Sequence, residues 1–149
     1  YDVLDDGFGQ GALYTVVNQA ENLPTMYQKF YVYKDMPYAL VQVELGSDNE
    51  ISTNFMAPIS TSGENVVDIG TKTDARALFV PFSNDGYTAY NPETLNGAHT
   101  SYFVTAIFDN NSRNSVIAGS VDHDTWKQVQ APGQQQITGI LTFLVHLPV

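Results

Sequence analysis

The chain has 149 residues, of which 43% are hydrophobic and only 15% charged, and its formal net charge is −10. This length suits one domain with a core of its own, and the composition is too apolar for a disordered segment. Because the six basic residues stand singly, there is no basic patch for nucleic acid or for an anionic membrane. The lack of cysteine excludes disulfides, thiolate catalysis and cysteine-ligated zinc.

With so few charges, the polar surface must rely on Asn, Gln, Ser, Thr and Tyr, as is common in extracellular β-proteins. We therefore expect a secreted, extracellular or periplasmic protein. The chain begins at Tyr1 without an initiator methionine or a signal peptide, which suggests a mature or excised piece. The longest apolar run, residues 140–149, contains His146 and Pro148 and is too short to cross a bilayer.

Strand patterns dominate the chain, because apolar residues alternate with period two and no helical period is found. In chain order, the predicted strands are residues 11–18, 25–34, 38–45, 51–58, 65–69, 75–80, 101–108, 115–121 and 137–146. Turn sequences rich in Asn, Asp, Gly and Pro lie between them. This spacing predicts an all-β fold, an antiparallel β-sandwich, with residues 1–149 forming a single domain.

The C-terminal region has two unusual segments. Residues 128–136 are rich in Gln, Pro and Gly, and we predict a loop there within the domain. Residues 137–149 are apolar on both faces of a strand, with Leu141 and Phe143 on one face and Leu144 on the other. A strand of this kind is expected either at the centre of a sheet or paired with a second chain.

Aromatic side chains beside carboxylates and amides suit carbohydrate, because rings stack on sugars while Asp and Asn bind hydroxyl groups. The predicted carbohydrate-binding residues occupy two stretches: Asp85, Tyr87, Tyr90 and Asn91 in the first, and Asp124 and Trp126 in the second. Polar turns would place the first stretch in a loop. For the second, a structural role competes, since Trp is highly buried on average and the carboxylates could cap turns.

A stripe of Tyr27, Tyr31 and Tyr33 beside Lys29 lies on one face of the strand predicted at residues 25–34. It could be a flat platform for sugar stacking, an interface with another domain or a second copy, or part of the core. These alternatives stay open.

Metal and catalytic sites find little support in the sequence. The oxygen-rich turns at residues 48–50 and 109–111 leave calcium open, although Asp and Asn also favour plain turns, which we prefer here. No other metal, no cofactor and no catalytic residue is assigned, because P-loop, nucleophile-elbow and paired-histidine motifs are missing. Paired carboxylates could serve a glycosidase, but sixteen acidic residues make chance pairs easy to find.

From about Asp6 to Lys127, the order of short phrases resembles the N-terminal β-sandwich region of bacterial glycoside hydrolases related to family 36, the α-galactosidase group. The phrases that carry the resemblance are Asp6-Gly7-Phe8-Gly9-Gln10-Gly11, Asn54-Phe55-Met56-Ala57-Pro58-Ile59, Arg76-Ala77-Leu78-Phe79-Val80-Pro81-Phe82, Asn84-Asp85-Gly86, Asp109-Asn110 and His123-Asp124-Thr125-Trp126-Lys127.

The resemblance implies a large sandwich of galactose-mutarotase-like (supersandwich) or jelly-roll-like type, which precedes a (β/α)8 catalytic barrel. The family's two catalytic aspartates lie in that barrel, so no residue here inherits their roles. The chain departs from the pattern after Lys127, and the residues that remain are too few for a barrel of about 250 residues.

We therefore predict a non-catalytic module of a bacterial polysaccharide-degrading system that binds or presents carbohydrate. Its partners would be carbohydrate and either a catalytic domain or a second copy of itself, with neither nucleic acid nor membrane among them. One alternative is a purely structural or oligomerisation domain that supports a missing barrel. Another is a small glycosidase that uses paired carboxylates.

Overall fold

A computed structural model describes residues 1–53, 56–60, 67–70, 72–80, 90, 92–94, 100–121, 129–131, 136–138 and 141–146. Within these residues the fold is all-β and every strand pairing is antiparallel, as the sequence predicts. No helix in this part of the chain is long and apolar enough to cross a membrane.

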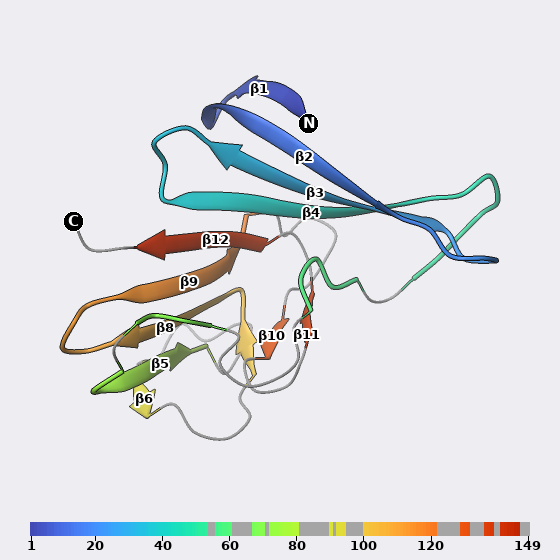
Figure 1. Cartoon of the computed structure of the whole chain (residues 1–149). Helices are drawn as coiled ribbons and strands as arrows, with labels where there is room; N and C mark the ends of the chain where they lie inside the picture. The colour runs from blue at the N-terminus through green and yellow to red at the C-terminus, as the bar shows by residue number, and fades with distance from the viewer. Residues whose placement is uncertain are drawn as a thin grey trace.

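The strands are β1 (Asp2–Asp6), β2 (Gly9–Asn18), β3 (Thr25–Tyr33), β4 (Tyr38–Gly46), β5 (Ala75–Phe79), β6 (Glu93–Thr94), β7 (Ser101–Tyr102), β8 (Val104–Asp109), β9 (Ser115–Ser120), β10 (Val129–Ala131), β11 (Gln136–Thr138) and β12 (Leu141–His146). Nine of them form one large sheet in the order β1-β2-β3-β4-β12-β9-β8-β5-β6, and three form a small sheet in the order β11-β10-β7. The large sheet twists strongly from β1 to β6, and β2, β3 and β4 are its longest strands (Figure 1).

Strand β12 lies between β4 and β9 and joins the N-terminal strands to the rest of the large sheet (Figure 1). On one side Leu141 pairs with Val41 of β4, and on the other side Leu141 to His146 pair with β9. Of the two alternatives for this doubly apolar segment, the central position is therefore confirmed for residues 141–146. The position also explains its composition, because a central strand is covered on both faces more often than an edge strand.

Five buried apolar side chains lie on one face of the large sheet, whereas the buried Tyr33 lies on the other face. Val41 and Val43 of β4, Ala77 and Phe79 of β5 and Ala118 of β9 are each at most 9% exposed. The strand register puts all five on the same face, because residues paired across an antiparallel ladder share a face. The amide of Gln28, on this face of β3, donates to the carbonyl of Pro58, so the segment around residue 58 lies against it.

The break between β7 and β8 occurs at Phe103, which has a φ of 64°. A non-glycine residue in this left-handed region interrupts a strand. The predicted single strand at 101–108 is therefore two strands, with Ser101–Tyr102 in the small sheet and Val104–Asp109 in the large one. The carbonyl of Phe103 accepts the N–H of Ser120 at 2.9 Å, which fixes the break against β9.

Other expectations need correction. The predicted loop at 128–136 contains strand β10, and the predicted strand at 137–146 is divided into β11 and β12. Residues 51–53, 56–58 and 67–69, which belong to two further predicted strands, lie outside any strand. Strands β1, β6 and β10 were not predicted from the sequence, because β1 is acidic, β6 is very short and β10 lies in a Gln-rich stretch.

Among the described strands, β12 alone joins the two halves of the large sheet, so we predict that truncation after Thr138 removes the single cooperative unfolding transition. Thermal unfolding followed by circular dichroism checks this, with truncation after His146 as the control that keeps β12 intact. An unchanged melting temperature in the shorter chain would mean that the two halves hold together without β12.

Candidate functional site

Of the residues predicted from the sequence to bind carbohydrate, Tyr90 is described by the structure. Its exposed fraction is 37%, and it interacts with another residue of the chain. Asp85, Tyr87, Asn91, Asp124 and Trp126 lie outside the described residues. A site formed by these loop residues therefore stays a prediction.

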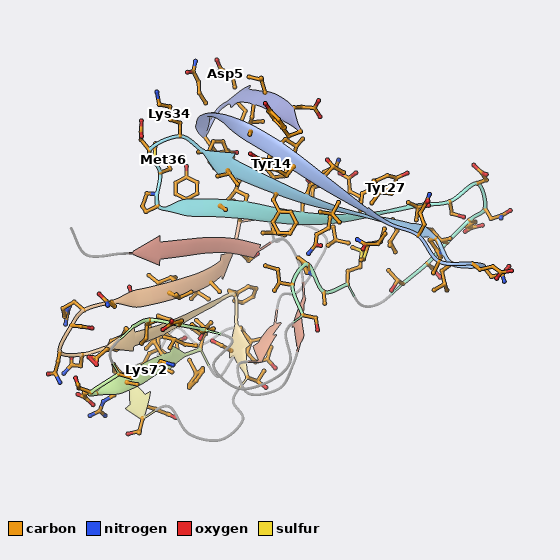
Figure 2. All side chains as sticks on the ribbon, in the orientation of Figure 1. Asp5, Tyr14, Tyr27, Lys34, Met36 and Lys72 are labelled. Carbon is orange, nitrogen blue, oxygen red and sulfur yellow. The ribbon has the colours of Figure 1, made fainter. Side chains whose placement is uncertain are left out.

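The tyrosine stripe of β3 lies among the described residues and forms a mixed aromatic and polar surface with β4. Antiparallel pairing sets Tyr27 opposite Glu44 and Lys29 opposite Gln42. We call Tyr27, Lys29, Tyr31, Gln42 and Glu44 the tyrosine face. It lies on the opposite side of the sheet from Val41 and Val43, since side chains alternate along each strand. Figure 2 shows Tyr27 on the long β2–β4 hairpins, at the far end of the large sheet from Lys72.

Two short hydrogen bonds order the polar groups of this face. Lys29 Nζ donates to Glu44 Oε2 at 2.6 Å, and the hydroxyl of Tyr31 donates to Gln42 Oε1 at 2.7 Å. The bond to Glu44 is the main reason that the pKa of Lys29 lies above its usual value, against the opposing effect of burial. Lys29 and Glu44 are 24% and 42% exposed at their side chains, so both remain within reach of a ligand.

These bonds leave part of the hydrogen-bonding capacity of the face unused. An ammonium group has three N–H donors, an amide has an NH2 group, and a carboxylate has two oxygens. Within the described residues, Lys29 spends one donor on Glu44, while the amide nitrogen of Gln42 and Glu44 Oε1 make no hydrogen bond. Donors and acceptors for ligand hydroxyl groups therefore lie beside the two tyrosines, with Lys29 and Gln42 at the register between them and Glu44 opposite Tyr27.

The ring of Tyr27 lies across Gly46 at the end of β4. A Cβ atom at position 46 would come within 3.0 Å of Tyr27 Cε2, which is closer than ordinary contact distance. The absence of a side chain at Gly46 thus lets the ring lie over the β4 backbone. This contact orients Tyr27 along the sheet surface.

Tyr33 continues the stripe in sequence but belongs to the interior. It is only 3% exposed, and its ring packs between Phe8 and Tyr38 with centroid separations of 6.0 and 5.6 Å. Its hydroxyl donates to Asp6 Oδ2 at 3.0 Å. Burial, followed by this hydrogen bond, raises the pKa of Tyr33 to about 12. The core interpretation is therefore the right one for this tyrosine, while Tyr27 and Tyr31 are half-buried at the surface.

The turn at 109–111, where the sequence allows either a calcium site or a plain turn, is organised by a buried carboxylate. Asp109 has no exposed surface and accepts the backbone N–H groups of Thr73, Asp74, Asn111 and Ser112 at 2.9 to 3.2 Å. These bonds, with that from Asp74 the strongest, hold the pKa of Asp109 well below its usual range although burial opposes them. The carboxylate is thus satisfied by N–H donors, and the plain-turn interpretation fits it better than a cation ligand.

The structure adds residues that the sequence analysis did not single out, namely Gln42 and Glu44 on the tyrosine face and Asp6 beside Tyr33. A signal for the first two existed. Gln42 and Glu44 alternate with the buried valines of β4, and the short turn after β3 brings them back beside the tyrosines. Within the described residues, no three His, Asp or Glu side chains gather as a metal site.

Comparison with known proteins gives no relatives: no family model, no curated protein and no solved structure matches this chain.

From the buried hydroxyl of Tyr33 we predict that Tyr33→Phe lowers the free energy of unfolding by about 1 kcal/mol at neutral pH, the usual worth of one hydrogen bond. Because the folded pKa is raised, the stability due to Tyr33 is complete below about pH 10 and is lost between about pH 10 and 12. Urea unfolding of wild type and variant should therefore converge over that range. Tyr14→Phe, at an exposed tyrosine, is the control and should be nearly neutral; an equal loss in both variants contradicts the assignment.

For Asp109 we predict that replacement by Asn lowers the melting temperature at neutral pH, since an amide cannot accept four N–H groups. The folded pKa is depressed, so the carboxylate's stabilisation is present above its ordinary pKa of about 3.9 and is lost as the pH falls below it. Melting curves at decreasing pH should converge for wild type and variant. Asp74→Asn is the matched control, because the Asp74 side chain binds Arg76 and only its backbone N–H reaches Asp109.

Proposed function

We propose that this chain is a carbohydrate-binding module and that the tyrosine face is its binding surface. The observation that carries the proposal is the placement of unused donors and acceptors of Lys29, Gln42 and Glu44 beside Tyr27 and Tyr31 on one face of β3 and β4. Sugars need both kinds of contact, because their ring faces are apolar and their edges carry hydroxyl groups. The fixed hydrogen bonds of the face reduce the entropy that a ligand must overcome.

The dimensions of the face favour an oligosaccharide over a single sugar. Tyr27 and Tyr31 are four residues apart on one strand, which separates their backbones by about 13 Å. The face is also nearly neutral, since Lys29 and Glu44 form an ion pair at 2.6 Å. A neutral, extended ligand fits these properties, with an affinity between millimolar and micromolar, or about −4 to −8 kcal/mol.

For the architecture, we propose a β-sandwich in which the small sheet and the segment around residue 58 form the layer opposite the buried face of the large sheet. The burial of Val41, Ala77 and Phe79 on that face supports this arrangement, and so does the contact between Gln28 and Pro58. The resemblance of the sequence to the sandwich region of α-galactosidase-like enzymes favours the same architecture, a secreted bacterial origin and the absence of catalysis by this chain alone.

The test is a glycan array followed by isothermal titration calorimetry on the best ligand. Tyr31→Ala and Tyr27→Ala should each weaken binding by about 0.5–1.5 kcal/mol, the worth of one aromatic contact. Tyr14→Ala is the matched control, because Tyr14 is an exposed tyrosine on the other face of the same hairpins. Equal losses in all three variants, or full binding by the Tyr27 and Tyr31 variants, would contradict a site on the tyrosine face.

The same assay separates the predicted loop site from the tyrosine face. If Tyr87→Ala, Tyr90→Ala or Trp126→Ala abolishes binding with an unchanged melting temperature while the β3 variants bind normally, the loops hold the sugar. Turnover of aryl glycosides that one Asp replacement abolishes would instead establish the glycosidase alternative.

A second function, support of another protein domain, is favoured by a separate observation. On the face opposite the tyrosine face, the outer strands leave apolar side chains exposed: Val3 is 88% exposed, Tyr14 47%, Val16 45% and Val32 44%. Register places the four on the same face of β1, β2 and β3. Apolar residues grouped in this way are typical of surfaces that other proteins cover. Absence of any glycan binding would leave this function as the better proposal.

A further inference from the structure

The outer edge of β2 is paired with another strand along only part of its length. Strand β1 pairs with Gly9 to Leu13, whereas β2 continues to Asn18. Within the described residues, no strand pairs with the outer side of residues 14–18. We call residues 14–18 the open edge.

The backbone of the open edge presents groups that a further strand can bind. The N–H of Lys34 donates to the carbonyl of Gln10 at 2.7 Å, so Gln10 and every second residue after it direct their backbone groups toward β3. Thr15 and Val17, the residues between, therefore direct their N–H and carbonyl groups outward. Among the described residues these groups have no partner.

The side chains of the open edge suit strand addition and lack the usual protection against it. Its sequence, Tyr14-Thr15-Val16-Val17-Asn18, has high strand propensity and no charge. Exposed edges are normally protected by charged residues or proline. Strand β1 is protected in this way, by three aspartates among its five residues. Val16 and Val17 are instead 45% and 52% exposed.

The charges around the open edge indicate what would bind there. Asp2 lies beside one end, where β1 stops covering β2, and Glu21 follows the other end, and both are exposed. The rings of Tyr1 and Tyr14 are 5.6 Å apart beside the first end and are also exposed, which suits the side chain of Lys or Arg. A second copy of this chain would instead bring its own acidic residues and a net charge of −10 against the same charge.

We propose that the open edge binds an extended, cationic segment of a partner protein, which adds to the large sheet as a further strand in line with β1. The backbone of the added segment forms hydrogen bonds with the N–H and carbonyl groups of Thr15 and Val17. An apolar side chain of the segment packs beside Val16, and basic residues at its two ends form ion pairs with Asp2 and Glu21. This interaction uses backbone groups at the edge of the sheet rather than the side chains of the tyrosine face, although the two regions are adjacent, since Val17 pairs with Tyr27.

The experiment measures fluorescence anisotropy of labelled synthetic peptides with the whole chain. One peptide has a Val-Thr-Val-Thr-Val core with Lys at both ends, a second has the same core with Glu at both ends, and a third is the Lys peptide with alternate backbone nitrogens methylated. We expect the Lys peptide to bind saturably and the other two to bind at least about tenfold more weakly. The methylated peptide tests backbone pairing without any change to the protein.

On the protein, Val17→Pro removes an outward N–H that has no partner among the described residues, and proline is tolerated on edges that face solvent. It should weaken binding of the Lys peptide by about tenfold or more, while Val17→Thr, which keeps the N–H, should bind as wild type does. Equal binding of all the peptides, or of both Val17 variants, would overturn the proposal. Sedimentation that shows a dimer abolished by Val17→Pro, without peptide binding, would overturn it in favour of a second copy.

Discussion

The large sheet depends on one strand that arrives last in the chain. Strand β12 lies between β4 and β9, so among the described strands the meander β1–β4 and the group β5, β6, β8 and β9 belong to one sheet only through it. The meander β1–β4 is made of neighbours in sequence, joined by short turns, and can form locally. The pairing of β12 with β4 closes a loop of about a hundred residues, and loop-closure entropy makes such contacts late and slow.

A buried carboxylate organises the strands on the β9 side of β12. Asp109, at the end of β8, holds the turn into β9 through Asn111 and Ser112 and holds the segment before β5 through Thr73 and Asp74. One carboxylate therefore fixes the relative positions of β5, β8 and β9 in the folded sheet. The cost of burying the charge is offset by backbone N–H donors, each of which would otherwise need a partner of its own.

The strand pattern of the sequence was enough to find β2, β3, β4, β5, β8 and β9, and it was clearest where buried and more exposed side chains alternate, as in β4 and β5. The order of the strands in the sheet could not be predicted from the sequence pattern, since pairings such as β4 with β12 depend on the whole chain. The break at Phe103 was also hidden, because no feature of its composition requires a left-handed backbone there. Strand β1 was not predicted because three of its five residues are aspartates, which usually indicate a turn.

For the candidate site, the sequence identified the tyrosine stripe but could not divide it. Tyr31 and Tyr33 are equivalent in the alternation, yet Tyr31 meets Gln42 at the surface while Tyr33 is covered by Phe8 and Tyr38. The difference comes from Phe8, in the turn between β1 and β2, and from Tyr38, at the start of β4, whose rings pack against Tyr33. A prediction from β3 alone lacks that information, whereas the register of its neighbours supplies it.

The two proposed binding regions share the β2–β4 hairpins and differ in charge for a structural reason. On the tyrosine face, Lys29 and Glu44 are opposite charges on adjacent strands and neutralise each other at 2.6 Å, which leaves hydrogen bonding and ring contact as the means of recognition. At the open edge, Asp2 and Glu21 have no basic neighbour within the described ion pairs, so their field remains for a cationic ligand. A neutral sugar and a basic strand would therefore select different surfaces of the same hairpins, and salt should weaken only the second interaction.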